Sequence, residues 1–276
     1  QKMTAVRLFF RSVWIGICAL SMLAQTRLLL GLPLAPGWPD GFVLGSAVFA
    51  YNFTHSDRRV KWGAWLAGLF GGFCFVLPLL PVPGVEATSA ASPDRWQWAV
   101  CVPAVLWPAY YGLRWPGNAG LRGVPVAKPL VVALAWAWVT VMLPVPMEQW
   151  SGAVGILLGR SAFIFALALA YDLVDLDYDR QHGLRTLAAR IGIRKTFLLI
   201  FGALLVAACC CCANLFLGVY AWNMAFALCA SLVFSAWWLW ILIEKTHWTG
   251  WQKVLIDALM AGQFLIILGI HHYTNL

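Results

Sequence analysis

The sequence predicts an all-α polytopic membrane protein, and three observations support this fold class. Of the 276 residues, 62% are hydrophobic and only 11% are charged, whereas soluble domains carry about 25% charged residues. The apolar residues form long continuous runs, which excludes a β-barrel because barrel strands alternate. The net charge of +8 therefore indicates a positive-inside bias rather than a nucleic-acid partner.

Nine apolar segments are long enough to be interpreted as membrane spans. Their approximate bounds are 8–31, 40–55, 62–82, 96–113, 127–146, 152–172, 196–219, 221–243 and 254–272. Since no soluble segment or long linker interrupts them, residues 1–276 are expected to form a single transmembrane domain. The four consecutive cysteines at 209–212 point in different directions around a helix, so they are interpreted as small packing residues rather than metal ligands.

The distribution of Lys and Arg predicts the orientation of the spans. With the N-terminus in the cytoplasm, the cytoplasmic segments hold 16 of the 19 basic residues. The opposite side keeps only Arg27 and Arg95, and Arg160 lies within a span. We therefore expect an integral multi-pass membrane protein whose N-terminus and charged loops are cytoplasmic and whose C-terminus lies on the opposite side.

The most acidic stretch, Tyr171–Gly192, directly continues an apolar span and holds four of the eleven acidic residues. On a continuous helix, Asp172, Asp175 and Asp179 fall within about 60° of arc on one face, and Asp177 points away. Ligands that offer only oxygen suit a hard cation, above all Mg²⁺, which often shares its shell with substrate phosphates. The stretch is therefore interpreted as a metal site at the cytoplasmic membrane face, and the alternative is a solvated acidic helix end.

Polar and basic side chains in two other cytoplasmic loops could complete such a site. Asn52 lies at the end of the second span, and Arg58 and Arg59 follow it, where paired guanidinium groups would bind phosphate oxygens bidentately. The loop between the fourth and fifth spans adds a phenol and cations from Tyr110, Arg114 and Lys128. The alternatives are an interfacial polar collar for the first loop and a purely topological role for the second.

Arg160 lies twelve residues before Asp172, which is about 18 Å along a helix and near the middle of the membrane. Exposing its charge to lipid would cost at least about 3 kcal/mol. Arg160 is therefore expected either to line an internal cavity as a substrate-binding residue or to have a structural partner.

The nine spans with an Asp-rich motif after the sixth resemble the UbiA superfamily of intramembrane prenyltransferases. Asp172, Asp175 and Asp179 match the family's D-x-x-D-x-x-x-D motif, and the following GLRTLAARIG is similar to the family's continuation. Tyr110 to Arg114 is similar to its Tyr-x-x-x-Lys element, with Arg in place of Lys.

The family's first motif, N-x-x-x-D-x-x-x-D, is degenerate in this chain. Asn52 fits its first position, but Ser56 and Val60 stand at the acidic positions, and Asp57 is one residue out of register. One of the two Mg²⁺ sites that the resemblance implies is therefore expected to be weakened or lost.

The resemblance implies about nine helices around a central cavity and a role in isoprenoid biosynthesis. The implied reaction is Mg²⁺-dependent transfer of an isoprenyl group from an allylic prenyl diphosphate to an aromatic or other lipophilic acceptor within the membrane. Asp172, Asp175 and Asp179 would be the catalytic metal ligands. The alternative is a non-catalytic UbiA-like subunit of a larger membrane complex that binds lipid or pigment. A transporter would show internal repeats, of which the sequence gives no clear sign.

Overall fold

The computed structural model describes residues 5–53, 58–76, 125–181, 186–244 and 250–274, and all regular structure within these ranges is helical. Five of the described helices are long and apolar enough to cross a membrane. They are α1 (Ala5–Leu29), α6 (Trp150–Val174), α9 (Ile193–Phe216), α10 (Trp222–Glu244) and α11 (Gly250–Thr274). The chain therefore has the composition and helix lengths of a multi-pass membrane protein.

Five shorter α-helices complete the described part of the chain: α2 (Trp38–Phe53), α3 (Arg58–Val76), α5 (Ala127–Ala137), α7 (Leu176–Gln181) and α8 (Leu187–Ile191). Helix α5 continues as a π-helix over Trp138–Met142, and a 3₁₀ turn over Met147–Gln149 precedes α6. Eight of the nine predicted spans contain a described helix, and the fourth, 96–113, lies outside the described residues.

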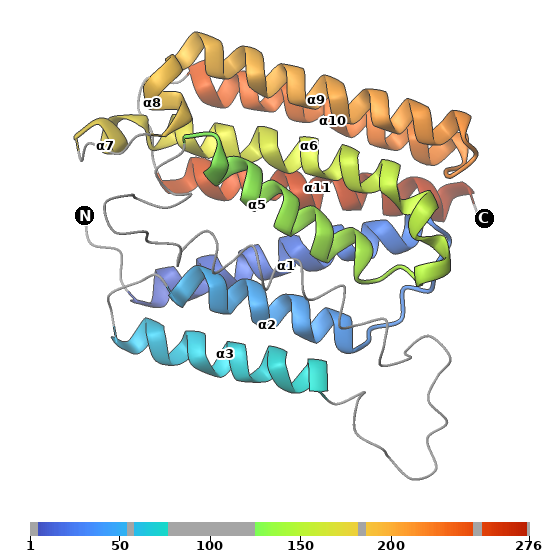
Figure 1. Ribbon diagram of the computed structural model, residues 1–276, viewed down its shortest axis with the longest axis horizontal. Coiled ribbons are helices and arrows are strands. Elements are labelled where there is room, and N and C mark those ends of the chain that lie inside the picture. Colours follow the sequence, from blue (N-terminus) through green and yellow to red (C-terminus); the bar gives the residue numbers. More distant parts are fainter. Residues whose placement is uncertain (1–4, 54–57, 77–124, 182–185, 245–249, 275–276) are drawn as a thin grey trace.

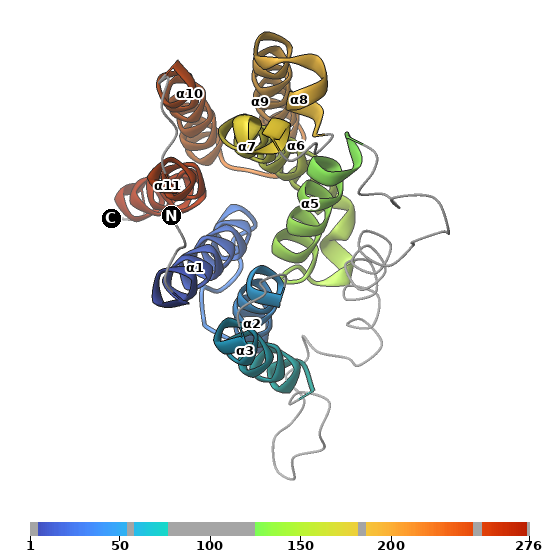
Figure 2. The same cartoon turned by 90° about the vertical axis from the view of Figure 1, so that its left-hand side faces the viewer.

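The long helices run side by side along the molecule (Figure 1) and are seen nearly end-on in Figure 2. Helix α1 contacts α2 and α11, α2 contacts α3, and α6 contacts α5 and α9. The starts of α1, α5 and α11 and the end of α6 lie at the end of the bundle that also carries α7 and α8 (Figure 1). Helix α11 ends at the opposite end, so this topology brings residues far apart in the sequence to one face.

The bundle exposes apolar side chains on its surface and buries polar ones inside, as expected for a protein surrounded by lipid. Leu205, Phe226 and Val233 are each more than half exposed on the outer surface. Inside, Gln25 of α1 donates to Gln263 of α11 at 3.0 Å, and Gln263 donates in turn to a serine of α10 at 3.0 Å. Because lipid offers no hydrogen-bond partners, such polar side chains bond to neighbouring helices, although Gln25 Oε1 has no partner among the described residues.

Small residues allow two pairs of helices to approach closely. At Gly45 of α2, an added Cβ would lie 2.6 Å from the Ala67 carbonyl and 2.7 Å from Gly71 Cα on α3. At Gly155 of α6, it would lie 2.1 Å from Asn214 Oδ1 on α9. Membrane helices pack through such glycines because van der Waals contact replaces the hydrophobic effect.

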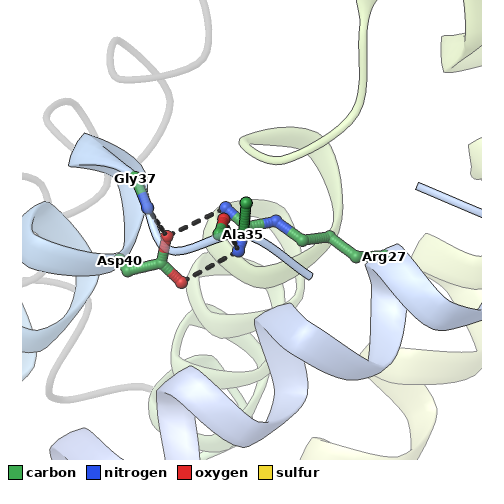
Figure 3. A network of polar contacts seen from close by, with 4 residues as sticks. All are labelled: Arg27, Ala35, Gly37 and Asp40. Atoms are coloured by element: carbon green, nitrogen blue, oxygen red, sulfur yellow. Dashed lines mark hydrogen bonds and ion pairs between the residues drawn. The ribbon is translucent and has the colours of Figure 1, made fainter. Parts of the chain in front are cut away.

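The turn between α1 and α2 is held by a bidentate ion pair (Figure 3). The two terminal nitrogens of Arg27 donate to the two carboxylate oxygens of Asp40 at 3.0 and 2.9 Å. Asp40 also accepts from the Gly37 amide at 2.8 Å, and Arg27 donates to the Ala35 carbonyl at 3.4 Å. Arg27 thus connects the last turn of α1 to the first turn of α2.

Candidate functional site

The acidic stretch forms a helix end followed by a short second helix. Helix α6 ends at Val174, Asp175 caps it with φ −91° and ψ 3°, and α7 begins at Leu176. The Asp175 amide still donates to the Tyr171 carbonyl at 3.0 Å, and the Asp179 amide donates to the Asp175 carbonyl at 2.8 Å. The expectation of one continuous helix through the three aspartates is therefore wrong, because the backbone turns where the apolar run gives way to polar residues.

Lysines from two other helices neutralise two of the predicted ligands. Lys128 of α5 places its Nζ 2.7 Å from Asp172 Oδ1, and Lys253 of α11 forms an ion pair with Asp175 Oδ1. The Asp172 side chain is only 1% exposed, whereas that of Asp175 is 35% exposed. The predicted residues Asp172 and Lys128 are therefore brought together, and Lys253 is an addition that the sequence did not suggest.

The helix ends make this arrangement electrostatically unusual. Carboxylates at the C-terminal end of a helix are unfavourable because the helix dipole is negative there. Asp172 and Asp175 nevertheless lie at the end of α6. The lysines that pair with them come from the first turns of α5 and α11, where the helix dipole has its positive end. The two lysines therefore offset negative charge that is unfavourable for α6 itself.

Two buried carboxylate oxygens remain available for a cation. Asp172 Oδ2 and Asp179 Oδ2 are inaccessible to solvent and have no hydrogen-bond partner among the described residues. Both Asp175 and Asp179 are close enough to Asp172 to repel its charge. No set of three or more His, Cys, Asp or Glu side chains in the described ranges converges tightly enough to hold a metal alone. The donors fit Mg²⁺ as a partial oxygen shell, which leaves positions for water and phosphate.

A second polar cluster lies next to the aspartates and was also missed by sequence reasoning. The Tyr171 hydroxyl donates to the Lys253 carbonyl at 3.1 Å and lies close to the side chains of Arg11, Tyr51 and Asp257. Asp257 is 3% exposed, and its Oδ2 has no hydrogen-bond partner in the described part of the chain. A lone carboxylate within the apolar segment 254–272 was a signal of the same kind as Arg160.

The residues predicted from the first-motif region have other positions. Asn52 is 2% exposed and donates to Ser12 Oγ at 2.7 Å and to the Val48 carbonyl at 3.0 Å, so its amide connects α2 to α1. Arg58 and Arg59 begin α3, but their side chains lie outside the described residues, as Tyr110 and Arg114 do entirely. Their predicted roles remain predictions.

Arg160 is buried at the middle of α6, at 5% exposure. It donates to the Met22 carbonyl at 2.8 Å, to Thr140 Oγ1 at 3.3 Å and to Thr26 Oγ1 at 3.4 Å. It also lines a cavity of about 30 Å³, which is large enough for one or two water molecules. All three of its described acceptors are neutral. One of them, Thr140, belongs to the π-helix, and π-helical turns are often found at functional sites.

Comparison with known proteins places this site within a recognised domain. Residues 115–251 match the model of the UbiA prenyltransferase family, and the match includes Lys128, Arg160 and all three aspartates. No curated protein matches the sequence. The chain therefore carries a domain of the UbiA prenyltransferase family on an all-helical membrane fold.

Proposed function

We propose that this protein transfers an isoprenyl group from an allylic prenyl diphosphate to an aromatic or other lipophilic acceptor within the membrane. Family membership implies prenyl transfer. The observation that carries the proposal is the end of α6, where Asp172, Asp175 and Asp179 are concentrated and two buried carboxylate oxygens have no partner among the described residues. Lys128 and Lys253 add cations to the same place.

The roles of the residues follow from their charges. Asp172, Asp175 and Asp179 would hold Mg²⁺, which when bound would neutralise the charge that develops on the departing diphosphate. Lys128 contributes an ammonium group 2.7 Å from Asp172 Oδ1, and such a group binds phosphate as a point charge. The predicted cations Arg58, Arg59 and Arg114 would approach the diphosphate from the other loops, with Tyr110 beside them and Asn52 supporting the second span.

The membrane interior would accommodate the isoprenoid chain. In the proposed fold, about nine helices surround a central cavity whose apolar walls exclude water from the allylic cation that forms when the carbon–oxygen bond breaks. The acceptor would attack that cation and lose a proton. Arg160, which lines the small cavity enclosed by α1, α6, α9, α10 and α11, would bind a polar group of the acceptor deep in the membrane.

Replacing the aspartates tests the proposal. Asp175→Ala and Asp179→Ala should each lower turnover by about a hundredfold or more, because a metal ligand contributes several kcal/mol to charge stabilisation. Asp177→Ala is the matched control, since Asp177 is an exposed residue of α7 within the same stretch. Turnover is measured as diphosphate release by folded protein in nanodiscs. Unchanged release in both ligand variants would contradict the metal assignment.

A second candidate function is that of a non-catalytic subunit that keeps the fold and binds lipid or pigment in a larger membrane complex. Two observations favour it: lysines already neutralise Asp172 and Asp175, and five tryptophans are more than half exposed on the described surface. These are Trp65, Trp222, Trp237, Trp240 and Trp251. Purification from native membranes in a mild detergent distinguishes the two functions. The subunit should copurify with stoichiometric partners and release no diphosphate.

A further inference from the structure

Lys253 of α11 is held at the position where a cation would bind Asp175. Its ammonium forms an ion pair with Asp175 Oδ1, and its own backbone carbonyl accepts a hydrogen bond from the Tyr171 hydroxyl at 3.1 Å. The backbone of Lys253 is therefore fixed against the last turn of α6. The side chain has a flexible four-carbon stem with three donors, so its ammonium can change partner while the helix stays in place.

The surroundings of Asp175 differ from those of Asp172. The side chains of Lys253 and Asp175 are 19% and 35% exposed, so water and ions can reach this pair, whereas Asp172 is 1% exposed. A divalent cation at Asp175 would be strongly repelled by an ammonium group that remained on the same carboxylate. Lys253 and a metal ion therefore compete for Asp175, and each weakens the binding of the other.

We propose that Lys253 is a diphosphate-binding residue, and that its ammonium group pairs with Asp175 as long as no metal ion is bound there. When Asp175 holds a metal ion, the ammonium group of Lys253 would be released from this carboxylate and would be free to bind the diphosphate oxygens. This inference rests on the proposed function, because it assigns a residue of α11 to the same diphosphate site. It also provides a cation next to the diphosphate in a chain whose first motif lacks the acids for a second metal.

The exchange predicts effects of opposite sign on two ligands. In Lys253→Met, the affinity for Mn²⁺ should rise by about tenfold because the competing ammonium is absent, while the affinity for inorganic diphosphate at saturating Mn²⁺ should fall by about tenfold. In Asp175→Asn, diphosphate should bind more tightly than to wild type in the absence of metal, because Lys253 has been released, while Mn²⁺ should bind more weakly.

The measurements use the full chain in nanodiscs, with Mn²⁺ binding followed by electron paramagnetic resonance and diphosphate binding by titration calorimetry. Lys195→Met is the matched control. Lys195 is an exposed lysine in the first turn of α9, and this helix begins at the end of the bundle that carries α7 and α8 (Figure 1). It should change neither affinity. Lys253→Arg should retain diphosphate binding, which a purely structural loss in Lys253→Met would not explain.

Several results would overturn the exchange. It is wrong if Lys253→Met weakens both ligands together, if it changes neither, or if the wild-type protein binds no Mn²⁺. The first two outcomes are separable from failure of the proposed function, whereas the absence of Mn²⁺ binding would contradict both proposals. Opposite shifts without any prenyl transfer would support the exchange and contradict the enzyme, whereas Mg²⁺-dependent transfer without opposite shifts would contradict the exchange alone.

Discussion

Arg160 keeps a guanidinium group in the middle of the membrane with neutral partners. Its described acceptors are a backbone carbonyl of α1 and two threonine hydroxyls. Burying a charge without an opposite charge costs free energy that neutral hydrogen bonds only partly recover. A buried charge kept at such a cost is more readily explained by a ligand than by the fold.

Replacing Arg160 by Met tests this interpretation. Because the buried charge disappears together with its hydrogen bonds, the thermal midpoint should stay unchanged or rise, while kcat/KM for the acceptor should fall by tenfold or more, which corresponds to about 1.4 kcal/mol. Differential scanning fluorimetry and prenyl transfer assays measure the two effects. A large fall in the thermal midpoint with normal activity per folded molecule would instead make Arg160 a structural residue.

Among individual residues, those that lie close together in the sequence could be recognised as a site, whereas those contributed by distant helices could not. Asp172 and Asp175 could be recognised from their spacing. Lys253 is 78 residues away from Asp175. The distribution of basic residues predicts that both lie on the same side of the membrane, but it does not indicate that the start of α11 contacts the end of α6. Asp257 could have been noticed as a lone carboxylate in an apolar segment, but its neighbours could not.

Among the helices, α6 and α9 depend on a close approach at Gly155. The added methyl group of Gly155→Ala would lie 2.1 Å from Asn214 Oδ1 and would disturb the hydrogen bond from Asn214 to the Tyr220 hydroxyl at 3.0 Å. We expect a loss of about 1–3 kcal/mol, typical of overpacking, seen as a lower thermal midpoint. Gly152→Ala in the same helix meets nothing within 4 Å and should leave the midpoint unchanged or slightly higher.

The turn from α1 to α2 depends on the Arg27–Asp40 pair. Asp40→Asn removes the carboxylate that accepts two hydrogen bonds from Arg27 and one from Gly37. Hydrogen bonds to charged groups contribute about 1.5–3 kcal/mol each when buried, and this partly exposed pair should lose about 1–2 kcal/mol on substitution. Chemical denaturation in detergent measures the loss, and an unchanged midpoint would mean that the pair does not hold the turn.

Sequence patterns located the helices better than their ends. Eight predicted spans contain described helices, because long apolar runs are a strong signal. The break at Asp175 was not predicted: the angular argument assumed a continuous helix, and a single turn residue between two helical segments leaves the spacing of the aspartates unchanged. The distribution of basic residues places Arg27 on the non-cytoplasmic side, but its ion pair could not be predicted because Asp40 lies in the next helix.

For the whole molecule, we expect the two ends of the bundle to face opposite sides of the membrane. Helix α7 and the end of α11 lie at opposite ends (Figure 1). In a Cys101→Ser background, Tyr178→Cys and Tyr273→Cys should therefore react with a membrane-impermeant maleimide from opposite sides. Both tyrosines are more than half exposed, and the other seven cysteines lie in helices within the bundle. Labelling of both positions from one side would contradict the arrangement.

The class of the molecule followed from composition, because few charges and long apolar runs are compatible with few other folds. The reaction could not follow from composition. It depends on which loops meet at the end of α6, and the segment 77–124, which carries Tyr110 and Arg114, lies outside the described residues. The family domain connects the Asp-rich stretch to prenyl transfer.

The most direct test of the central claim is metal-dependent release of diphosphate from an allylic substrate. Purified protein in nanodiscs is incubated with geranyl or farnesyl diphosphate and a panel of lipophilic aromatic acceptors, and diphosphate release is followed with Mg²⁺, with EDTA, and after Mg²⁺ is restored. We expect diphosphate release with Mg²⁺, its loss in EDTA and its recovery when Mg²⁺ is restored. Folded protein that binds Mg²⁺ and releases no diphosphate from either substrate would contradict this claim.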